Sequence, residues 1–311
     1  MILSIYCKRL KKDVHNLFLT WFIIPFAFFF INCSFSQVVS NPDSVFGKRN
    51  IITGVSLSAF GVGSLIGLNQ LWYSKFPKSK LHSFNDADEW FQMDKMGHAF
   101  TAYQISRSMT SILKWNGLSL KKARFTAAGI AFTYLTTIEL MDGKSEGWGF
   151  SWSDVGANSI GSILSLIQPA EEYFFLKQSY HPTSYASLRP NVLGASSVEK
   201  YLKDYNGQTY WLSFSPNFIF PSKPIPEWLL LSFGYGVDAK LYGKYNDVTF
   251  PGGSVYNAKR VFLLSLDLNV SRLPIKIKWV RTILKPFSAI KIPFPAFYWK
   301  GGVCYFNPFY F

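Results

Sequence analysis

Two short polar motifs in this chain share the same internal spacing. The first is Asp94-Lys95-Met96-Gly97-His98, and the second is Asp154-Val155-Gly156-Ala157-Asn158. In each motif the outer polar residues are four positions apart, which places both side chains on one face of a helix. Glu139, near the end of the apolar segment 123–140, is a third candidate contributor. Because the neighbouring residues are mostly small or apolar, these acids and the imidazole are costly to bury unless they are paired.

Several interpretations of this polar set stay open. One is a buried polar network that fixes the register of the helices, made of Asp94, His98, Glu139, Asp154 and Asn158. Another is a metal site in which Asp94 and His98 supply two ligands and Glu139 or Asp154 a third, although the chain has no HExxH motif and no paired Cys/His cluster.

Acid–base hydrolysis without a metal is a further interpretation. His98 would be the base, a carboxylate (Asp94, Glu139 or Asp154) would orient it, and Ser145 or Ser153 would be the nucleophile. No GxSxG motif supports a nucleophilic serine. The set could instead recognise a ligand without reacting, and the binding candidates are Lys95, Asn158, Ser153 and Tyr103.

The elements that must position these residues form a predicted helical bundle over residues 37–180. We expect helices at 51–72, 90–114, 119–140 and 154–168, the last capped by Ser153. Gly63 and Gly67 form a GxxxG pattern that lets another helix approach closely, and Gly156 and Gly161 favour a similar approach. We expect none of the four helices to be transmembrane, because the second and third carry charges and the fourth is short.

The second half of the chain, 181–311, is predicted to be a basic, aromatic, β-rich region. Strand-like alternation occurs at 210–220, 228–239 and 261–270. Twelve of the 16 prolines lie in 182–311, so we do not expect closure into a barrel. The fold class is therefore α+β: an N-terminal bundle of about four helices followed by an antiparallel β-rich region.

The N-terminus has the layout of a secretory signal. Basic residues at 8–12 precede a mostly apolar segment at 17–31, and Ser34-Phe35-Ser36 has the form of a signal-peptidase site. We interpret residues 1–36 as a cleaved signal peptide, with an uncleaved anchor as the alternative. Lipidation at Cys33 is a further possibility, although Asn32 is larger than the residue that normally precedes a lipidated cysteine.

Composition favours a packed protein in contact with lipid. Hydrophobic residues make up 49% of the 311 residues and charged residues only 16%, which argues against a disordered chain. The net charge is +14, and the final segment 251–311 has nine Lys or Arg against one acid, Asp267. A basic aromatic surface binds nucleic acid or anionic lipid, and the secretory signal favours lipid. A solvated sheet edge protected by lysines is the alternative.

The polar motifs resemble those of a known family. The ordered elements Asp94-Lys95-x-x-His98, Glu139 and Asp154-x-x-x-Asn158-x-x-Gly161 are similar to those of the YfiM-like predicted periplasmic lipoproteins, whose function is uncharacterised. More distantly they resemble the VanZ-like membrane proteins associated with glycopeptide resistance. The resemblance covers roughly a fifth of the chain and implies an envelope location without supplying a reaction.

We therefore predict an exported cell-envelope protein at the periplasmic face of the outer membrane. The favoured function is a non-enzymatic, outer-membrane-associated component that binds a ligand or a partner. The alternative is a hydrolase or transferase that acts on an envelope lipid or a peptidoglycan fragment through the His/Asp/Glu site. Membrane lipid or an outer-membrane protein is the expected partner, and nucleic acid is not. The sequence specifies neither a cofactor nor an oligomeric state.

Overall fold

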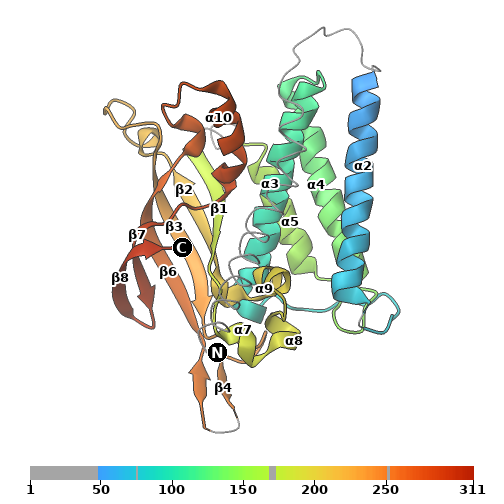
Figure 1. Cartoon of the computed structure of the whole chain (residues 1–311). Coiled ribbons are helices and arrows are strands. Elements are labelled where there is room, and N and C mark those ends of the chain that lie inside the picture. Colours follow the sequence, from blue (N-terminus) through green and yellow to red (C-terminus); the bar gives the residue numbers. More distant parts are fainter. Residues whose placement is uncertain (1–47, 75, 168–172, 251–252) are drawn as a thin grey trace, which may run out of the picture. The chain divides into compact units, whose positions relative to one another are not determined.

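The computed structural model describes residues 48–74, 76–167, 173–250 and 253–311, and the predicted signal peptide at 1–36 lies outside them. The described residues group into two compact units, with the boundary between Glu172 and Tyr173. The first unit is helical and the second is an antiparallel sheet with short helices, which confirms the predicted α+β class (Figure 1).

Four long helices make up most of the first unit. They are α2 (Lys48–Leu68), α3 (Met93–Trp115), α4 (Leu120–Asp142) and α5 (Trp152–Leu164). Two short helices, η1 (Asn69–Tyr73) and η2 (Glu89–Gln92), precede α3. Helix α3 packs against both α4 and α5, so the segments that carry the two polar motifs lie next to each other.

Small side chains let these helices pack closely. On α4 the alanines 123, 127 and 131 recur every four residues and are fully buried, as is Ala102 on α3. The closest approach is at Gly161 of α5, where an added Cβ would overlap the backbone carbonyl of Ala99 and lie 2.8 Å from the Cβ of Ala102. By contrast, Cβ atoms at Gly63 and Gly67 would meet nothing within 4 Å, so the GxxxG pattern makes no close helix contact among the described residues.

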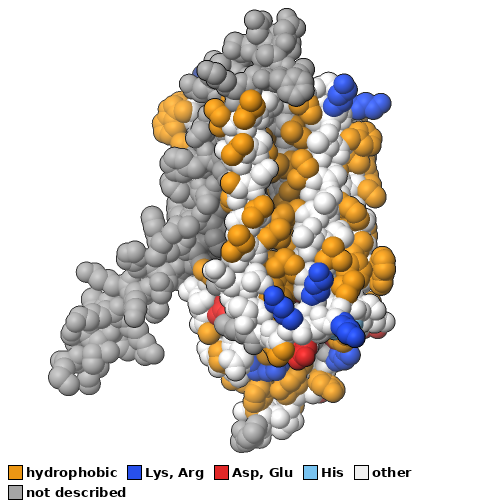
Figure 2. All heavy atoms as spheres, turned by 90° about the vertical axis from the view of Figure 1, so that its right-hand side faces the viewer, with side chains coloured by type: hydrophobic (Ala, Val, Ile, Leu, Met, Phe, Trp, Pro, Cys, Tyr) orange, Lys and Arg blue, Asp and Glu red, His pale blue; other side chains and the backbone are white. Residues whose placement is uncertain are grey.

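Helix α2 differs from the other helices by its exposed apolar surface. Residues Asn50–Leu68 have a mean hydropathy of 1.8, and only 6% of the most apolar window is buried. Figure 2 shows the face that includes this helix, with hydrophobic side chains along the helices and Lys and Arg side chains near their ends. Among the described residues α2 is long and apolar enough, by length and composition alone, to cross a membrane.

The second unit is built on a six-stranded antiparallel sheet of order β1-β2-β3-β6-β7-β8. Its strands are β1 (Phe174–Tyr180), β2 (Gln208–Phe214), β3 (Leu229–Asp238), β6 (Lys259–Leu268), β7 (Phe294–Lys300) and β8 (Val303–Tyr310). A separate hairpin pairs β4 (Asp247–Thr249) with β5 (Val255–Asn257). The short helices are α7 (Tyr185–Leu188), α8 (Pro190–Leu193), α9 (Ser197–Lys203), α10 (Lys278–Leu284), η3 (Tyr205–Gly207), η4 (Pro216–Phe218), η5 (Val270–Arg272) and η6 (Lys285–Ala289).

The three predicted strands correspond to β2, β3 and β6, but β7 and β8 were missed because each contains a proline. Pro295 of β7 lies at the register shift between Phe294 and Ala296, and Pro308 lies in the edge strand β8. A proline lacks the backbone N–H that a central ladder needs, so it is tolerated at irregularities and edges of this kind. Strand β1 lies in the second unit, whereas the sequence analysis placed residues up to 180 in the helical domain.

We predict that Gly161→Ala lowers the free energy of unfolding by about 1–3 kcal/mol, the usual cost of overpacking a tight contact. Gly156→Ala on the same helix is the matched control, because Gly156 is exposed and its added Cβ would meet nothing within 4 Å. The control should be neutral or stabilising by about 0.5–1 kcal/mol. Chemical denaturation followed by circular dichroism measures both values, and equal effects would contradict the close approach of α3 and α5.

Candidate functional site

A strained turn delivers the first polar motif to the helical unit. Trp90, Phe91 and Gln92 all have positive φ angles, of 51°, 53° and 62°, immediately before α3 begins. Each non-glycine residue in this region costs about 1–2 kcal/mol. The side-chain amide of Gln92 donates a hydrogen bond to the carbonyl of Ala87 at 2.9 Å and so ties the turn to the preceding loop. Strain of this kind persists where the surrounding contacts enforce it, and it is common at functional sites.

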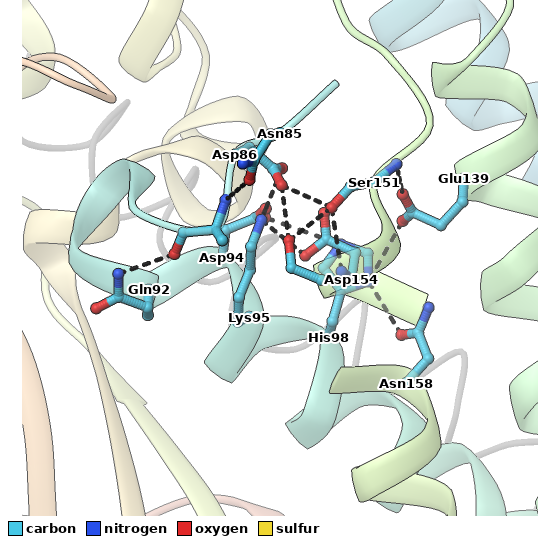
Figure 3. A network of polar contacts seen from close by, with 12 residues as sticks. Asn85, Asp86, Gln92, Asp94, Lys95, His98, Glu139, Ser151, Asp154 and Asn158 are labelled. Carbon is cyan, nitrogen blue, oxygen red and sulfur yellow. Dashed lines mark hydrogen bonds and ion pairs between the residues drawn. The ribbon is translucent and has the colours of Figure 1, made fainter. Parts of the chain in front are cut away.

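The ammonium of Lys95 lies among three carboxylates. Its Nζ is 2.6 Å from Asp86 Oδ2, 3.0 Å from Asp94 Oδ2 and 2.9 Å from Asp154 Oδ1 (Figure 3). These acids come from the loop before α3, from α3 itself and from α5. One partly buried cation therefore links α3 and the loop before it to α5, which is distant in the sequence.

Ser151 joins the same centre as the N-cap of α5. Its hydroxyl accepts a hydrogen bond from the backbone N–H of Asp154 at 3.1 Å and donates to Asp86 Oδ1 at 2.6 Å. Its backbone N–H points to Glu139 Oε2 at 3.4 Å. Ser153, the predicted cap, instead donates its hydroxyl to Asp86 at 2.8 Å. The helix begins earlier than predicted because Ser151 caps it.

The imidazole of His98 is held between the two motifs and Glu139. Its Nδ1 is 3.0 Å from Asn158 Oδ1 and 3.6 Å from Glu139 Oε1, whereas Nε2 is 3.8 Å from Asp94 Oδ1. Because the amide oxygen of Asn158 only accepts hydrogen bonds, Nδ1 carries the proton in this contact. The Nε2···Oδ1 distance is too long for a direct hydrogen bond, so a gap lies between His98 and Asp94.

Two buried polar atoms at the other edge of the His98 ring, where Nδ1 lies, make no hydrogen bond within the described part of the chain. They are Glu139 Oε1 and Asn158 Nδ2, on side chains that are 1% and 0% exposed. An unpaired buried polar atom costs about 1–3 kcal/mol. A fully satisfied structural network would leave neither atom in this state.

Acids outnumber cations in this centre, and burial therefore keeps some of them protonated. Burial raises the pKa of Glu139 to about 8 against the attraction of His98, and it raises the pKa of Asp142 to about 7 against a hydrogen bond from Tyr73. Burial and the negative charge of Asp94 also raise the pKa of Asp154. Near neutral pH these carboxyls hold protons that exposed carboxyls would have lost.

The basic groups shift because the acids surround them. Burial alone would lower the pKa of His98 and of Lys95, but the charges of Asp94 and Asp154 outweigh it and raise both values. Burial would raise the pKa of Asp86, but its bonds to Lys95 and Ser151 outweigh burial and lower it. Lys95 and Asp86 are therefore a lasting ion pair, while the groups around His98 titrate near neutrality.

The structure brings together most of the residues that the sequence singled out. Asp94, Lys95, His98, Glu139, Ser153, Asp154 and Asn158 all lie in this polar centre. Two candidates take other contacts. The ring of Tyr103 lies 5.4 Å from the guanidinium carbon of Arg107, and the hydroxyl of Ser145 accepts from the backbone of Gly147.

Four participants were missed by sequence reasoning. Asp86 and Asp142 were not among the candidates that the sequence suggested. Tyr73 and Ser151 carried no local signal, because their partners are distant in the sequence. The excess of acids around a single lysine is visible only once the tertiary contacts are known. It could not be recognised from the sequence.

The arrangement also contains a possible metal site. Asp94, His98 and Asp154 each offer a ligand atom, and these atoms lie within 4.8 Å of one another. This set differs from the predicted one, since Asp154 takes the place of Glu139. One imidazole nitrogen with carboxylate oxygens suits a divalent transition metal such as Zn²⁺ or Mn²⁺.

Comparison with known proteins gives one match. Residues 83–170 match the model of a family described as "Predicted periplasmic lipoprotein (DUF2279)", and this stretch contains α3, α4, α5 and the polar centre. Neither the curated proteins nor the solved structures contain a match to the chain. The family description agrees with an exported protein of the cell envelope, while Cys33 lies outside the matched stretch.

We predict that the free energy of unfolding falls as the pH rises from about 5 to about 8, with a chelator present. An acid whose pKa is higher in the folded chain than in the unfolded chain keeps its proton longer in the folded state. Between the two pKa values, a rise in pH therefore lowers the free energy of unfolding. For Glu139 this interval runs from 4.5 to about 8. At about 1.4 kcal/mol per pKa unit, Glu139 contributes at most about 4 kcal/mol. His98 acts in the same direction, because its raised pKa stabilises the fold only at lower pH.

Glu139→Gln tests the origin of this pH dependence. The amide resembles the protonated acid, so the variant should show a much flatter stability profile over the same pH range. Glu146→Gln is the control, because Glu146 is exposed and its substitution should leave the profile unchanged. Chemical denaturation at several pH values gives the profiles, and an unchanged slope in Glu139→Gln would contradict the assignment.

Removing the central cation should be costly. We predict that Lys95→Met lowers the free energy of unfolding by about 3–5 kcal/mol near pH 8, because the carboxylates of Asp86, Asp94 and Asp154 lose their partner. The loss should be smaller near pH 5, where these acids take up protons more readily. Lys114→Met, at an exposed position of the same helix, should have little effect. Equal losses at both pH values would argue against an electrostatic origin.

Proposed function

We propose that this chain is an exported cell-envelope protein, associated with the periplasmic face of the outer membrane, whose helical unit binds a divalent metal ion without catalysing a reaction. The family match over residues 83–170 supports the envelope location. For the sheet unit, the proposed partner is membrane lipid or an outer-membrane protein. The exposed apolar helix α2 adds support for membrane association.

The gap between His98 and Asp94 carries the metal proposal. With metal–ligand bonds of about 2.0–2.2 Å and a tetrahedral angle, two ligand atoms lie about 3.4 Å apart. The observed separation of His98 Nε2 and Asp94 Oδ1 is 3.8 Å, which is close to this value. The carboxylate of Asp154 completes a set of three protein ligands. A small shift of side chains would therefore accommodate an ion where a direct hydrogen bond does not form.

The surroundings of this gap are arranged as metal sites require. The Nδ1–H of His98 donates to Asn158, which fixes the tautomer that leaves the Nε2 lone pair facing Asp94. Asp94 divides its oxygens, with Oδ2 bound to Lys95 and Oδ1 directed to the gap. Glu139 Oε1 lies at the other edge of the ring, 3.6 Å from Nδ1, and is not part of the group of three ligand residues. Lys95 thus positions the acids without occupying the gap.

Acid–base catalysis on an envelope lipid or a peptidoglycan fragment is the second candidate. The observation in its favour is Glu139, whose pKa of about 8 and contact with His98 suit proton transfer near neutral pH. The partners of the His98 ring among the described residues are Asp94, Glu139 and Asn158. Because Ser145 and Ser153 bond elsewhere, this candidate would require water as the nucleophile.

Metal titration tests the proposal. We predict that the purified chain binds one equivalent of Zn²⁺ or Mn²⁺, that a chelator reverses binding, and that affinity rises with pH because the ion displaces protons from His98 and the carboxyls. Asp94→Asn and Asp154→Asn should each weaken binding at least about tenfold. An ion at a hundred times its dissociation constant should stabilise the fold by about 2.7 kcal/mol.

The matched control is Asp88→Asn, an exposed acid in the loop that also supplies Asp86. It should bind the ion like the unmodified chain. Absence of binding, or equal binding by all variants, would overturn the proposal and leave a structural network. Metal-independent turnover of a fluorescent phospholipid or a muropeptide, lost in a folded His98→Gln variant, would favour the enzymatic candidate instead.

A further inference from the structure

The two faces of the six-stranded sheet differ in polarity, because buried polar groups occur on one face and not among the apolar rows of the other. On the inner face, Lys177 Nζ lies 2.7 Å from Asp267 Oδ2, and both side chains are at most 1% exposed. The hydroxyl of Ser213 donates to Asp267 at 3.0 Å and contacts the hydroxyl of Ser232 at 2.7 Å. Ser265 adds a further buried hydroxyl to the same face. Charged and hydroxyl groups thus share this face with the buried apolar side chains of Trp211, Val261 and Leu263.

The opposite face carries the apolar side chains. A continuous row crosses five strands through directly paired residues: Leu212, Phe233, Leu264, Phe297 and Phe306. Phe233 is 51% exposed and Phe306 is 56% exposed. Contiguous apolar surface of this kind marks a binding face rather than a face in water.

One end of this face has an amphipathic rim. The next row contains Tyr235, Phe262 and Trp299, paired in register across β3, β6 and β7. Beyond it lies Arg260, an exposed residue whose guanidinium donates a hydrogen bond to the hydroxyl of Tyr235. Aromatic residues followed by basic ones are the arrangement found at the level of lipid headgroups, where Arg and Lys meet phosphates.

The apolar face has the dimensions of a membrane rather than of a small ligand. The outward-facing residues of β3 run from Leu229 to Tyr235, which at about 3.3 Å per residue spans about 20 Å. The apolar band of membrane-spanning sheets is about 25 Å tall. The row also continues onto the edge strand β8, where Phe309 is exposed as well.

We propose that this outer face of the sheet lies against the hydrocarbon of a lipid bilayer, with the Arg260 end at the anionic headgroups. The inference deepens the proposed membrane association of the sheet unit by naming lipid as the partner and the contact surface. It does not depend on metal binding by the helical unit. Lipid is favoured over a protein partner because the apolar rows, the aromatic rim and the basic end occur in the order in which a bilayer changes from hydrocarbon to phosphate.

Spin-label accessibility tests this surface. The full chain, with Cys7, Cys33 and Cys304 replaced by serine, would carry one new cysteine at a time: Phe233→Cys, Phe306→Cys or, as the headgroup-level control, Arg260→Cys. Each labelled protein is bound to vesicles of phosphatidylethanolamine and phosphatidylglycerol. Collisions are measured with oxygen, which concentrates in hydrocarbon, and with a polar nickel chelate, which stays in water. We expect the oxygen-to-nickel ratio at 233 and 306 to exceed that at 260 at least about fivefold.

Each other outcome overturns the proposal in a distinct way. Equal nickel access at all three positions would place the face in water. Low access to both reagents at 233 and 306 would mean that protein covers the face, as an outer-membrane partner would. Failure of the unlabelled full chain to float with the vesicles would overturn membrane association itself, while metal binding is measured separately. Circular dichroism identifies any misfolded variant. If Phe233→Cys misfolds, the comparison of 306 with 260 decides, because position 306 lies in the edge strand β8.

Discussion

The contact of Lys95 with Asp86, Asp94 and Asp154 is the interaction on which the polar centre depends. It neutralises part of an acidic cluster that would otherwise repel itself, and it joins the loop before α3 to α3 and α5. Ser151 strengthens the same junction by bonding Asp86 and the first turn of α5. The position of His98 relative to Asp154 follows from this junction. Lys95 therefore holds the three acids of the centre together, and Nε2 of His98 lies outside these contacts.

The two units differ in the surroundings of their buried polar groups. In the helical unit, the alanine-lined contact of α3, α4 and α5 brings backbones close together, so that polar side chains meet within short distances at one end. In the sheet unit, Lys177 and Asp267 are paired on the inner face while aromatic side chains face outward. The pair is fully desolvated, and the hydroxyl of Ser213 also donates to Asp267.

Sequence reasoning succeeded where local spacing determines geometry. The four-residue spacing of Asp94 with His98, and of Asp154 with Asn158, correctly predicted shared helix faces. It failed where contacts distant in the sequence determine a residue's partners, as for Asp86 and Tyr73. It also failed where the tertiary structure accommodates an exception to a local rule. Pro295 and Pro308 argued against strands, yet a register shift and an edge position accommodate them. Gly63 and Gly67 predicted a close helix contact that the structure shows at Gly161 instead, because a small residue permits an approach without causing one.

Protons and metal ions compete for the same atoms in the polar centre. Glu139 and Asp154 hold protons near neutrality because burial penalises their charge, and a divalent ion would supply the compensating charge instead. Lys95 stays charged in either case, since Asp94 and Asp154 raise its pKa. The centre would therefore exchange protons for an ion without losing the contacts that hold α3 and α5 together.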